Sequence, residues 1–316
     1  MNQSNLKKLQ NLLKEKDIDI FVINRSDEYL NEYISPNAER LNFITNFSGS
    51  AGRAIITPTD AFLYVDGRYT FQANTQINAK EIQAKHLNNF WTDLEKILLE
   101  EEYKIALDPT LHSIIEIEKV EKMLENSTSQ LQLIDKNFVD LIWENQPKTQ
   151  YTDIFDHPTS FAGQSRSEKL DILKKFLDQN EIDHYFVSGL DNIAWLLNLR
   201  ADDIKYTPLL YSYFLISKNN KHSLYVKESS MPEILKKEIQ TLININNIEN
   251  IGSIFNNINS SESIGLDFNS TTFYFLDLLR KQKINTKNLA NPCILLKAIK
   301  NETELDGAKK AHIRDG

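Results

Sequence analysis

The stretch Leu196-Leu197-Asn198-Leu199-Arg200-Ala201-Asp202-Asp203-Ile204 follows a long apolar run, residues 184–195, and has a counterpart earlier in the chain. The counterpart consists of an apolar segment ending in polar residues, Ile20–Glu28, and a second segment, Leu41–Gly52. Two such regions at a domain-sized separation indicate one structural unit used twice. The sequence therefore predicts a fold in which one structural unit occurs twice.

The elements around these regions recur in the same order. Each copy opens with an amphipathic helix. The apolar stripes are Leu6, Leu9, Leu12 and Leu13 in the first copy, and Leu170, Leu173, Phe176 and Leu177 in the second. A buried strand is expected at residues 18–23, and hairpins are expected at residues 53–65 and 211–227. Chance is the alternative because helix–strand–hairpin is a common pattern, but order and spacing together favour duplication.

Residues 143–163 interrupt the periodicity with Pro147 and Pro158, which disfavour helix. We place the domain boundary there and predict domains at residues 1–150 and 160–297. A helix should open beside Ser165 or Ser167, either of which could cap it, with Glu168 at the positive end of its dipole.

The C-terminal region predicts four further elements. A strand is expected at residues 262–267, a helix at 273–282 and a last strand at Ile294–Leu296. Asn301 followed by Glu304 has the spacing of a helix-start motif, so a helix is expected to run to Asp315.

Composition narrows the class of protein. The 316 residues suit about two domains, and their formal net charge of −8 argues against a nucleic-acid partner. Cys293 is the single cysteine, so no intrachain disulfide can form and a reducing compartment is favoured. No signal-peptide pattern or membrane-length apolar run occurs, and a cytoplasmic protein without a membrane partner is expected.

Motifs for catalysis or metal binding are weak. The six histidines show no metal-ligand spacing, and Cys293 is interpreted as a small buried residue rather than a nucleophile. Gly49-Ser50-Ala51-Gly52 lacks a phosphate-loop pattern and predicts a tight turn. Asp66-Gly67-Arg68 favours an Asp N-cap with an exposed Arg over direct catalysis. Asp202 and Asp203 could act as an acid and a base, but a cap or turn role is favoured.

Several segments together resemble the three-domain Xaa-Pro aminopeptidases (aminopeptidase P) of the creatinase/prolidase superfamily. Ala201 stands where this family is expected to have glycine. The matching segments are Ser26–Ile34, Phe47–Gly52, Asp66–Tyr69, Leu190–Arg200, Lys297–Asn301 and Ala311–Gly316.

The resemblance implies an α/β chain of two tandem creatinase/prolidase N-terminal-like domains, each a mixed sheet flanked by helices. Residues 298–316 would start a third, "pita-bread" domain that supplies the metal ligands. The full-length enzyme would then bind two Mn²⁺ and release the N-terminal residue of peptides whose second residue is proline. It would be a cytoplasmic homodimer, and residues 1–316 would contribute no catalytic or metal-binding residue and be inactive alone.

The resemblance also assigns positions within this chain. Asn198, Arg200, Asp202 and Asp203 would lie at the rim of the substrate cleft, with an intradomain brace as the alternative for Arg200. Gly49, Ser50, Gly52, Asp66 and Arg68 would form a structural or dimer motif. Two other functions stay open: a peptide- or protein-binding module on the same fold, and an α/β enzyme with its site between the two domains.

Overall fold

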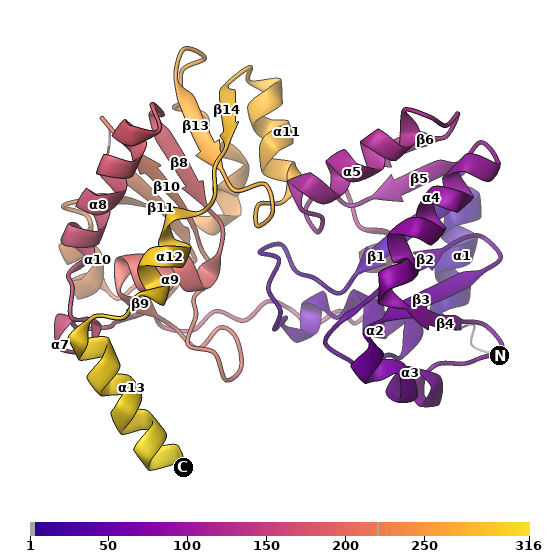
Figure 1. Cartoon of the computed structure of the whole chain (residues 1–316), viewed down its shortest axis with the longest axis horizontal. Coiled ribbons are helices and arrows are strands. Elements are labelled where there is room, and N and C mark those ends of the chain that lie inside the picture. Colours follow the sequence, from indigo (N-terminus) through magenta and orange to yellow (C-terminus); the bar gives the residue numbers. More distant parts are fainter. Residues whose placement is uncertain (1–3, 220) are drawn as a thin grey trace. The chain divides into compact units, whose positions relative to one another are not determined.

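The computed structural model describes residues 4–219 and 221–316 and divides the chain into two compact units, Met1–Thr149 and Gln150–Gly316 (Figure 1). Each unit holds a six-stranded sheet. We describe each unit by itself.

The first unit combines six strands with six α-helices in its described part. The strands are β1 (Ile20–Asn24), β2 (Gly52–Ile56), β3 (Ala61–Val65), β4 (Gln83–His86), β5 (Lys104–Leu107) and β6 (Gln130–Leu133). The helices are α1 (Asn5–Glu15), α2 (Arg40–Thr45), α3 (Thr70–Gln76), α4 (Phe90–Glu100), α5 (Ile114–Leu124) and α6 (Phe138–Ile142). Short 3-10 turns are η1 (Pro36–Ala38), η2 (Gly67–Tyr69) and η3 (Leu87–Asn89).

The second unit repeats this scheme with additions at both ends. Its strands are β7 (Phe155–Asp156), β8 (His184–Val187), β9 (Leu199–Arg200), β10 (Tyr213–Ser217), β11 (His222–Val226), β12 (Ile243–Asn247), β13 (Ser263–Leu266) and β14 (Asn285–Asn288). Its helices are α7 (Thr159–Ala162), α8 (Arg166–Gln179), α9 (Leu190–Leu197), α10 (Glu233–Ile239), α11 (Phe273–Lys281), α12 (Pro292–Ala298) and α13 (Glu302–Asp315). The 3-10 turns are η4 (Glu228–Ser230) and η5 (Ile248–Ser253).

The two large sheets have the same topology. Their strand orders are β4-β3-β2-β1-β5-β6 and β12-β11-β10-β8-β13-β14. In the first sheet, β1 pairs antiparallel with β2 and parallel with β5. In the second sheet, β8 pairs antiparallel with β10 and parallel with β13. The predicted fold class is therefore confirmed, and the matching topology supports the duplication.

Each sheet is buried on both faces at its centre. All five residues of β1 and all four of β8 are buried, as expected when helices cover both sides of a sheet. In the second unit, α8 and α9 share a core with Phe214 and Leu224 on one face. Phe275 of α11 packs on Phe186 from the other face, with 4.5 Å between ring centroids. Figure 1 shows α8 and α11 on opposite sides of this sheet.

Several local predictions are confirmed. Both hairpins form, and α8 begins with Ser165 as its N-cap, in a capping box with Glu168. The same motif opens α13, where Asn301 is the cap and Glu304 the third residue.

The strand predicted at Ile294–Leu296 is wrong, because these residues lie in α12. The Asn291 side chain accepts a hydrogen bond from the Cys293 amide, and Pro292 occupies the first turn, where its fixed φ suits a helix. A short apolar run does not by itself distinguish helix from strand. The last strand is instead the polar segment β14, which pairs only along β13 and so needs no apolar alternation.

Candidate functional site

The stretch from residue 196 to residue 204 begins as the end of a buried helix. Seven of the eight residues of α9 are buried, which explains why its sequence is almost wholly apolar. The helix ends at Asn198, whose φ of 52° is left-handed, a conformation that asparagine tolerates better than most residues. β9 follows at once and pairs antiparallel with β7.

A buried lysine binds this helix end. Lys169 of α8 is 1% exposed, and its Nζ donates to the Trp195 carbonyl and to Asn198 Oδ1, each at 2.7 Å. The same Nζ lies 4.3 Å from the centroid of the Trp195 ring. Burial lowers the pKa of Lys169 to about 8. A helix leaves its last four carbonyls without internal partners, and Lys169 satisfies one of them.

Arg200 and Arg166 also donate hydrogen bonds to backbone carbonyls at this helix end. Arg200 Nη1 donates to the carbonyls of Ala194, at 2.6 Å, and Leu199, at 2.9 Å. Arg166 Nε donates to the Leu197 carbonyl at 3.1 Å. Burial lowers the pKa of Arg200, and the nearby Glu304 carboxylate opposes this effect. These two hydrogen bonds of Arg200 are intradomain contacts, and sequence reasoning missed Lys169 and Arg166, which bind the same helix end.

The first turn of α13 is attached to the same place. The indole Nε1 of Trp195 donates to Glu304 Oε1 at 3.2 Å, while Glu304 Oε2 accepts from the Asn301 amide at 3.0 Å. Asn301 Nδ2 also donates to the Ala162 carbonyl at 2.8 Å. One carboxylate therefore joins the cap of α13 to the end of α9. The helix-start motif predicted the cap, but no sequence signal indicated the indole.

Asp202 and Asp203 differ in burial and in hydrogen bonding. Asp203 Oδ1 accepts from the amide and the hydroxyl of Thr152, at 2.7 and 2.9 Å, and Oδ2 accepts from the Tyr211 amide at 2.9 Å. Burial raises the pKa of Asp203, and these hydrogen bonds oppose that effect. Asp202 is exposed, and its amide donates to the Thr152 hydroxyl. Asp203 therefore braces the loop, as a turn residue would.

The first-unit motif forms a turn around an aromatic ring. Gly49 must lack a side chain, because a Cβ there would lie 2.2 Å from the buried Phe47 ring. Ser50 Oγ lies 2.6 Å from the Tyr69 hydroxyl, and the Ser50 carbonyl accepts from Arg25 Nη1. Gly52 begins β2, where a Cβ would lie 3.1 Å from the same ring. These contacts give the glycines a packing role.

Asp66 is an N-cap, as predicted. Its carboxylate accepts from the Arg68 amide and pairs with Arg68 Nε at 2.8 Å, and both interactions lower the Asp66 pKa. The Arg68 side chain is 73% exposed.

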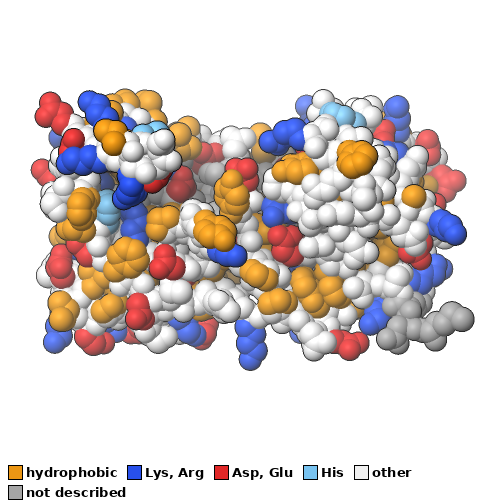
Figure 2. Space-filling view, turned by 90° about the horizontal axis from the view of Figure 1, so that it is seen from below, with side chains coloured by type: hydrophobic (Ala, Val, Ile, Leu, Met, Phe, Trp, Pro, Cys, Tyr) orange, Lys and Arg blue, Asp and Glu red, His pale blue; other side chains and the backbone are white. Residues whose placement is uncertain are grey.

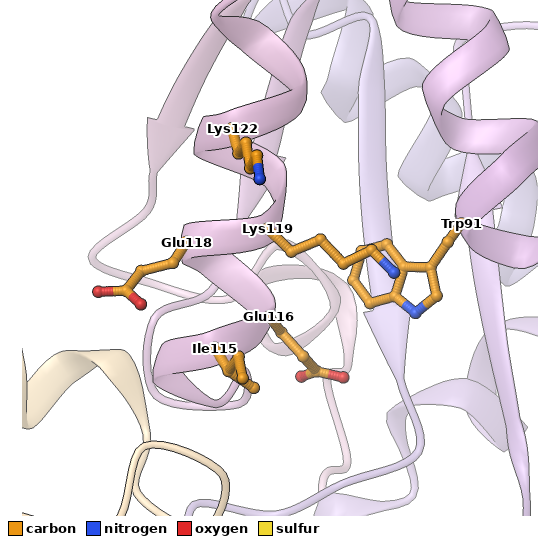
Figure 3. Close-up of a pocket in the computed structure, with 6 residues that line it drawn as sticks. All are labelled: Trp91, Ile115, Glu116, Glu118, Lys119 and Lys122. Atoms are coloured by element: carbon orange, nitrogen blue, oxygen red, sulfur yellow. The ribbon is translucent and has the colours of Figure 1, made fainter. Parts of the chain in front are cut away.

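A shallow groove of about 510 Å³ lies between α4 and α5 of the first unit (Figure 3). Trp91 forms one wall, and Lys119 Nζ lies 4.4 Å from its ring centroid. Arg53 lies over the same ring and pairs with Glu116. Lys119 and Arg53 thus both make cation–π contacts with the Trp91 ring. None of the predicted site residues lines this groove.

The described residues do not fit a dinuclear metal centre. Within residues 4–219 and 221–316, no three or more His, Cys, Asp or Glu side chains gather where they could hold a metal ion. No helix in the described part of the chain combines the length and apolar character that crossing a bilayer requires. On the face in Figure 2, basic and acidic side chains are interspersed.

Comparisons with known proteins agree with this architecture. Two models of the creatinase/prolidase N-terminal domain match residues 5–136 and 145–304. A probable Xaa-Pro aminopeptidase P of Ajellomyces dermatitidis is 31% identical over 98% of this chain, and one of Sordaria macrospora is 33% identical over 98%. These alignments cover 53% and 52% of the relatives, so the chain spans about half their length.

A solved structure shares the fold. The X-prolyl aminopeptidase of Caenorhabditis elegans, described as a cytosolic enzyme with a di-nuclear active site, superposes with a TM-score of 0.90 at 23% identity. The match covers 98% of this chain and 53% of that protein. The matched family models, one over each unit, show that this chain belongs to the creatinase/prolidase N-terminal domain family.

Proposed function

We propose that this chain is the non-catalytic N-terminal part of a metal-dependent Xaa-Pro aminopeptidase. The whole enzyme would release the first residue of peptides whose second residue is proline. The relatives that carry this name extend well beyond the aligned region, and the C. elegans enzyme with the same fold has a di-nuclear site. The two Mn²⁺ ions expected for the family would be held by residues outside 1–316.

Helix α13 is the observation that carries this proposal. It has fourteen residues and none of them is buried, and Figure 1 shows it projecting from its own unit. Leu305 is 47% exposed and Ile313 is 82% exposed. An isolated helix shorter than about 12–15 residues is marginal in water, so α13 needs a further packing surface. We infer that a downstream catalytic domain provides it.

We propose that the segment with Asn198, Arg200, Asp202 and Asp203 lies at the rim of the substrate cleft, where the buried Asn198, bonded to Lys169 and to the Gln164 carbonyl, positions the segment. Arg200 Nη1 donates to backbone carbonyls, and its guanidinium, which also interacts with the nearby Glu304 carboxylate, would pair with a carboxylate of the substrate or of another domain. Asp202 presents its carboxylate to solvent. The braces made by Lys169 and Asp203 hold the loop backbone in place for either contact.

The remaining proposals concern assembly and location. We place the complete enzyme in the cytoplasm as a homodimer, in keeping with the single buried cysteine and the cytosolic C. elegans enzyme. We propose that Gly49, Ser50, Gly52, Asp66 and Arg68 form a structural or dimer motif, in which the exposed Arg68, paired with Asp66, contacts a second copy.

Reading the coding sequence past codon 316 and assaying two proteins tests the proposal. Residues 1–316 should not cleave a fluorogenic peptide with proline second in the presence of Mn²⁺, whereas the extended chain should. Cleavage by residues 1–316 alone, or a coding sequence that stops at codon 316, would contradict the proposal. A folded extended chain that binds such peptides without cleaving them would favour the binding-module alternative.

A further inference from the structure

A polar cavity of about 610 Å³ lies on one face of the second sheet. Three neighbouring strands line it with alternate residues: Leu215 and Ser217 of β10, Ser223 and Tyr225 of β11, and Asn244 and Asn246 of β12. Alternate residues of a strand point to the same face. Their neighbours Phe214, Leu224 and Ile243 point to the other face, into the core with α8 and α9.

The strand register arranges these side chains in rows. Ser223 lies opposite Leu215 on one side and Asn244 on the other, and Tyr225 lies opposite Asn246. The segment that follows η5 forms the opposite wall with Asn257, Asn259 and two buried isoleucines, Ile254 and Ile258. Cavities of roughly 300–1,000 Å³ suit small ligands.

A buried histidine at the end of the cavity has an unused ring nitrogen. His184 is 3% exposed and lies opposite Ser217, whose Oγ is 2.9 Å from its Nδ1. Its Nε2 has no hydrogen-bond partner, and Glu262 Oε2, at 3.6 Å, is too far for one. Burial lowers the pKa of His184, and the adjacent Glu262 carboxylate opposes this effect. A buried, unpaired polar atom is costly unless a water or a ligand satisfies it.

The lining specifies a neutral ligand. No carboxylate lines the cavity within the described residues, and its one ammonium group, Lys221 Nζ, already donates to the Gln240 carbonyl. An anion would call for free cationic donors, and a metal cation for carboxylates. The carboxamides and hydroxyls that dominate the wall both donate and accept, as the hydroxyls of a sugar do. Leu215, Ile254 and Ile258 supply apolar surface for the C–H face of a sugar ring.

We propose that this cavity is a binding site for a small, neutral, polyhydroxylated ligand, a mono- or disaccharide. The backbone groups of β10 and β11 are used in the sheet, so the strand side chains provide the recognition. His184 lies at the end of the cavity, with its Nδ1 beside the Ser217 hydroxyl and its Nε2 beside Glu262. The site is independent of peptide cleavage and lies entirely within residues 184–259.

Two-dimensional amide NMR of residues 1–316, titrated with glucose, maltose and trehalose, tests the proposal. At least one sugar should give saturable shifts at β10–β12 with a Kd on the order of 1 mM. Ser223→Val and Asn244→Leu should each weaken this binding at least about fivefold, since each removes one donor–acceptor group. Asn285→Leu is the matched control, because Asn285 is also an exposed asparagine on an edge strand, β14, and lies outside the cavity.

Three results would overturn the proposal. The first is that none of the sugars gives saturable shifts up to about 50 mM, a range that covers weak millimolar sites. The second is that citrate or spermidine, used as charged comparison probes, binds the cavity in preference to the sugars. The third is that Asn285→Leu weakens binding as much as the two cavity variants do. Unchanged thermal unfolding of each variant shows that lost binding is not lost folding.

Discussion

At the scale of single residues, the second unit depends on buried charges at one helix end. In the sequence, Lys169 is one of several polar residues of α8, and nothing marks it as buried. In the structure it is among the largest fully buried side chains of the described residues. Its two hydrogen bonds satisfy a helix-terminal carbonyl and the side chain of the left-handed Asn198. Removing the ammonium group leaves both acceptors buried and unpaired, which is the costly case for a hydrogen bond.

Lys169→Met should lower the free energy of unfolding by about 2 kcal/mol. The substitution should also change how the free energy of unfolding depends on pH. The folded pKa of about 8 lies below the reference value of 10.5, so the folded state binds fewer protons between these values. Stability from this group therefore rises with pH from about 8 to 10.5. Urea unfolding of both proteins between pH 7 and 10.5 measures this, and the variant should lack the rise.

Lys174→Met is the control for this measurement. Lys174 lies on the same helix, has a side chain 46% exposed and pairs weakly with Asp171 at 3.9 Å. It should change the unfolding free energy by less than about 0.5 kcal/mol. If both variants behave alike, Lys169 does not support the end of α9.

At the scale of elements, caps determine where helices begin. Asn291, Ser165 and Asn301 each accept from a backbone amide at a helix start. For α13 the cap has a further task, because the body of the helix has no buried residue to hold it. Its order in residues 1–316 depends on contacts with Ala162 and Trp195 in the first turn.

Asn301→Ala should loosen α13 throughout its length. The substitution removes the N-cap bond, worth about 1 kcal/mol, together with the bond to the Ala162 carbonyl. Amide hydrogen exchange of residues 302–315 should accelerate severalfold, while β8 and β10 keep their protection. The matched substitution Asn285→Ala, on an exposed strand edge, should leave α13 unchanged. Equal exchange rates in the wild type and in Asn301→Ala would contradict this role of the cap.

At the scale of the whole molecule, each unit has its own hydrophobic core. Phe21, Leu63 and Phe138 belong to a cluster within the first unit, and Leu173 and Phe214 to one within the second. Each unit also has a complete sheet of the same strand order. A chain region with its own core and sheet satisfies the usual conditions for folding alone.

Residues 1–149 and 150–316, expressed separately, should each unfold in one cooperative thermal transition. Near-ultraviolet circular dichroism should report fixed aromatic packing in both, for instance around Phe43 and Trp143 in the first and Phe186 and Phe275 in the second. A piece that keeps helical signal but shows no cooperative transition would contradict independent folding of that unit.

The sequence by itself determined much of this protein, because the relevant signals are local. Leucine spacing fixed α1 and α8, the Asn301–Glu304 spacing fixed the start of α13, and the Asp66 cap followed from its position before a turn. Repetition of these signals in one order predicted the duplicated fold that the matching sheet topologies bear out.

Only the tertiary structure decided the features that depend on packing between distant residues. Lys169, Arg166 and Arg200 converge on one helix end because α8 and β9 both pack against α9. Ser223 and Asn244 lie side by side on one face of the sheet because of the register between β11 and β12. A one-residue slip of β12 would move the Asn244 side chain to the opposite face. Whether Ile294–Leu296 forms helix or strand was settled by the cap at Asn291, since the apolar run itself suits both.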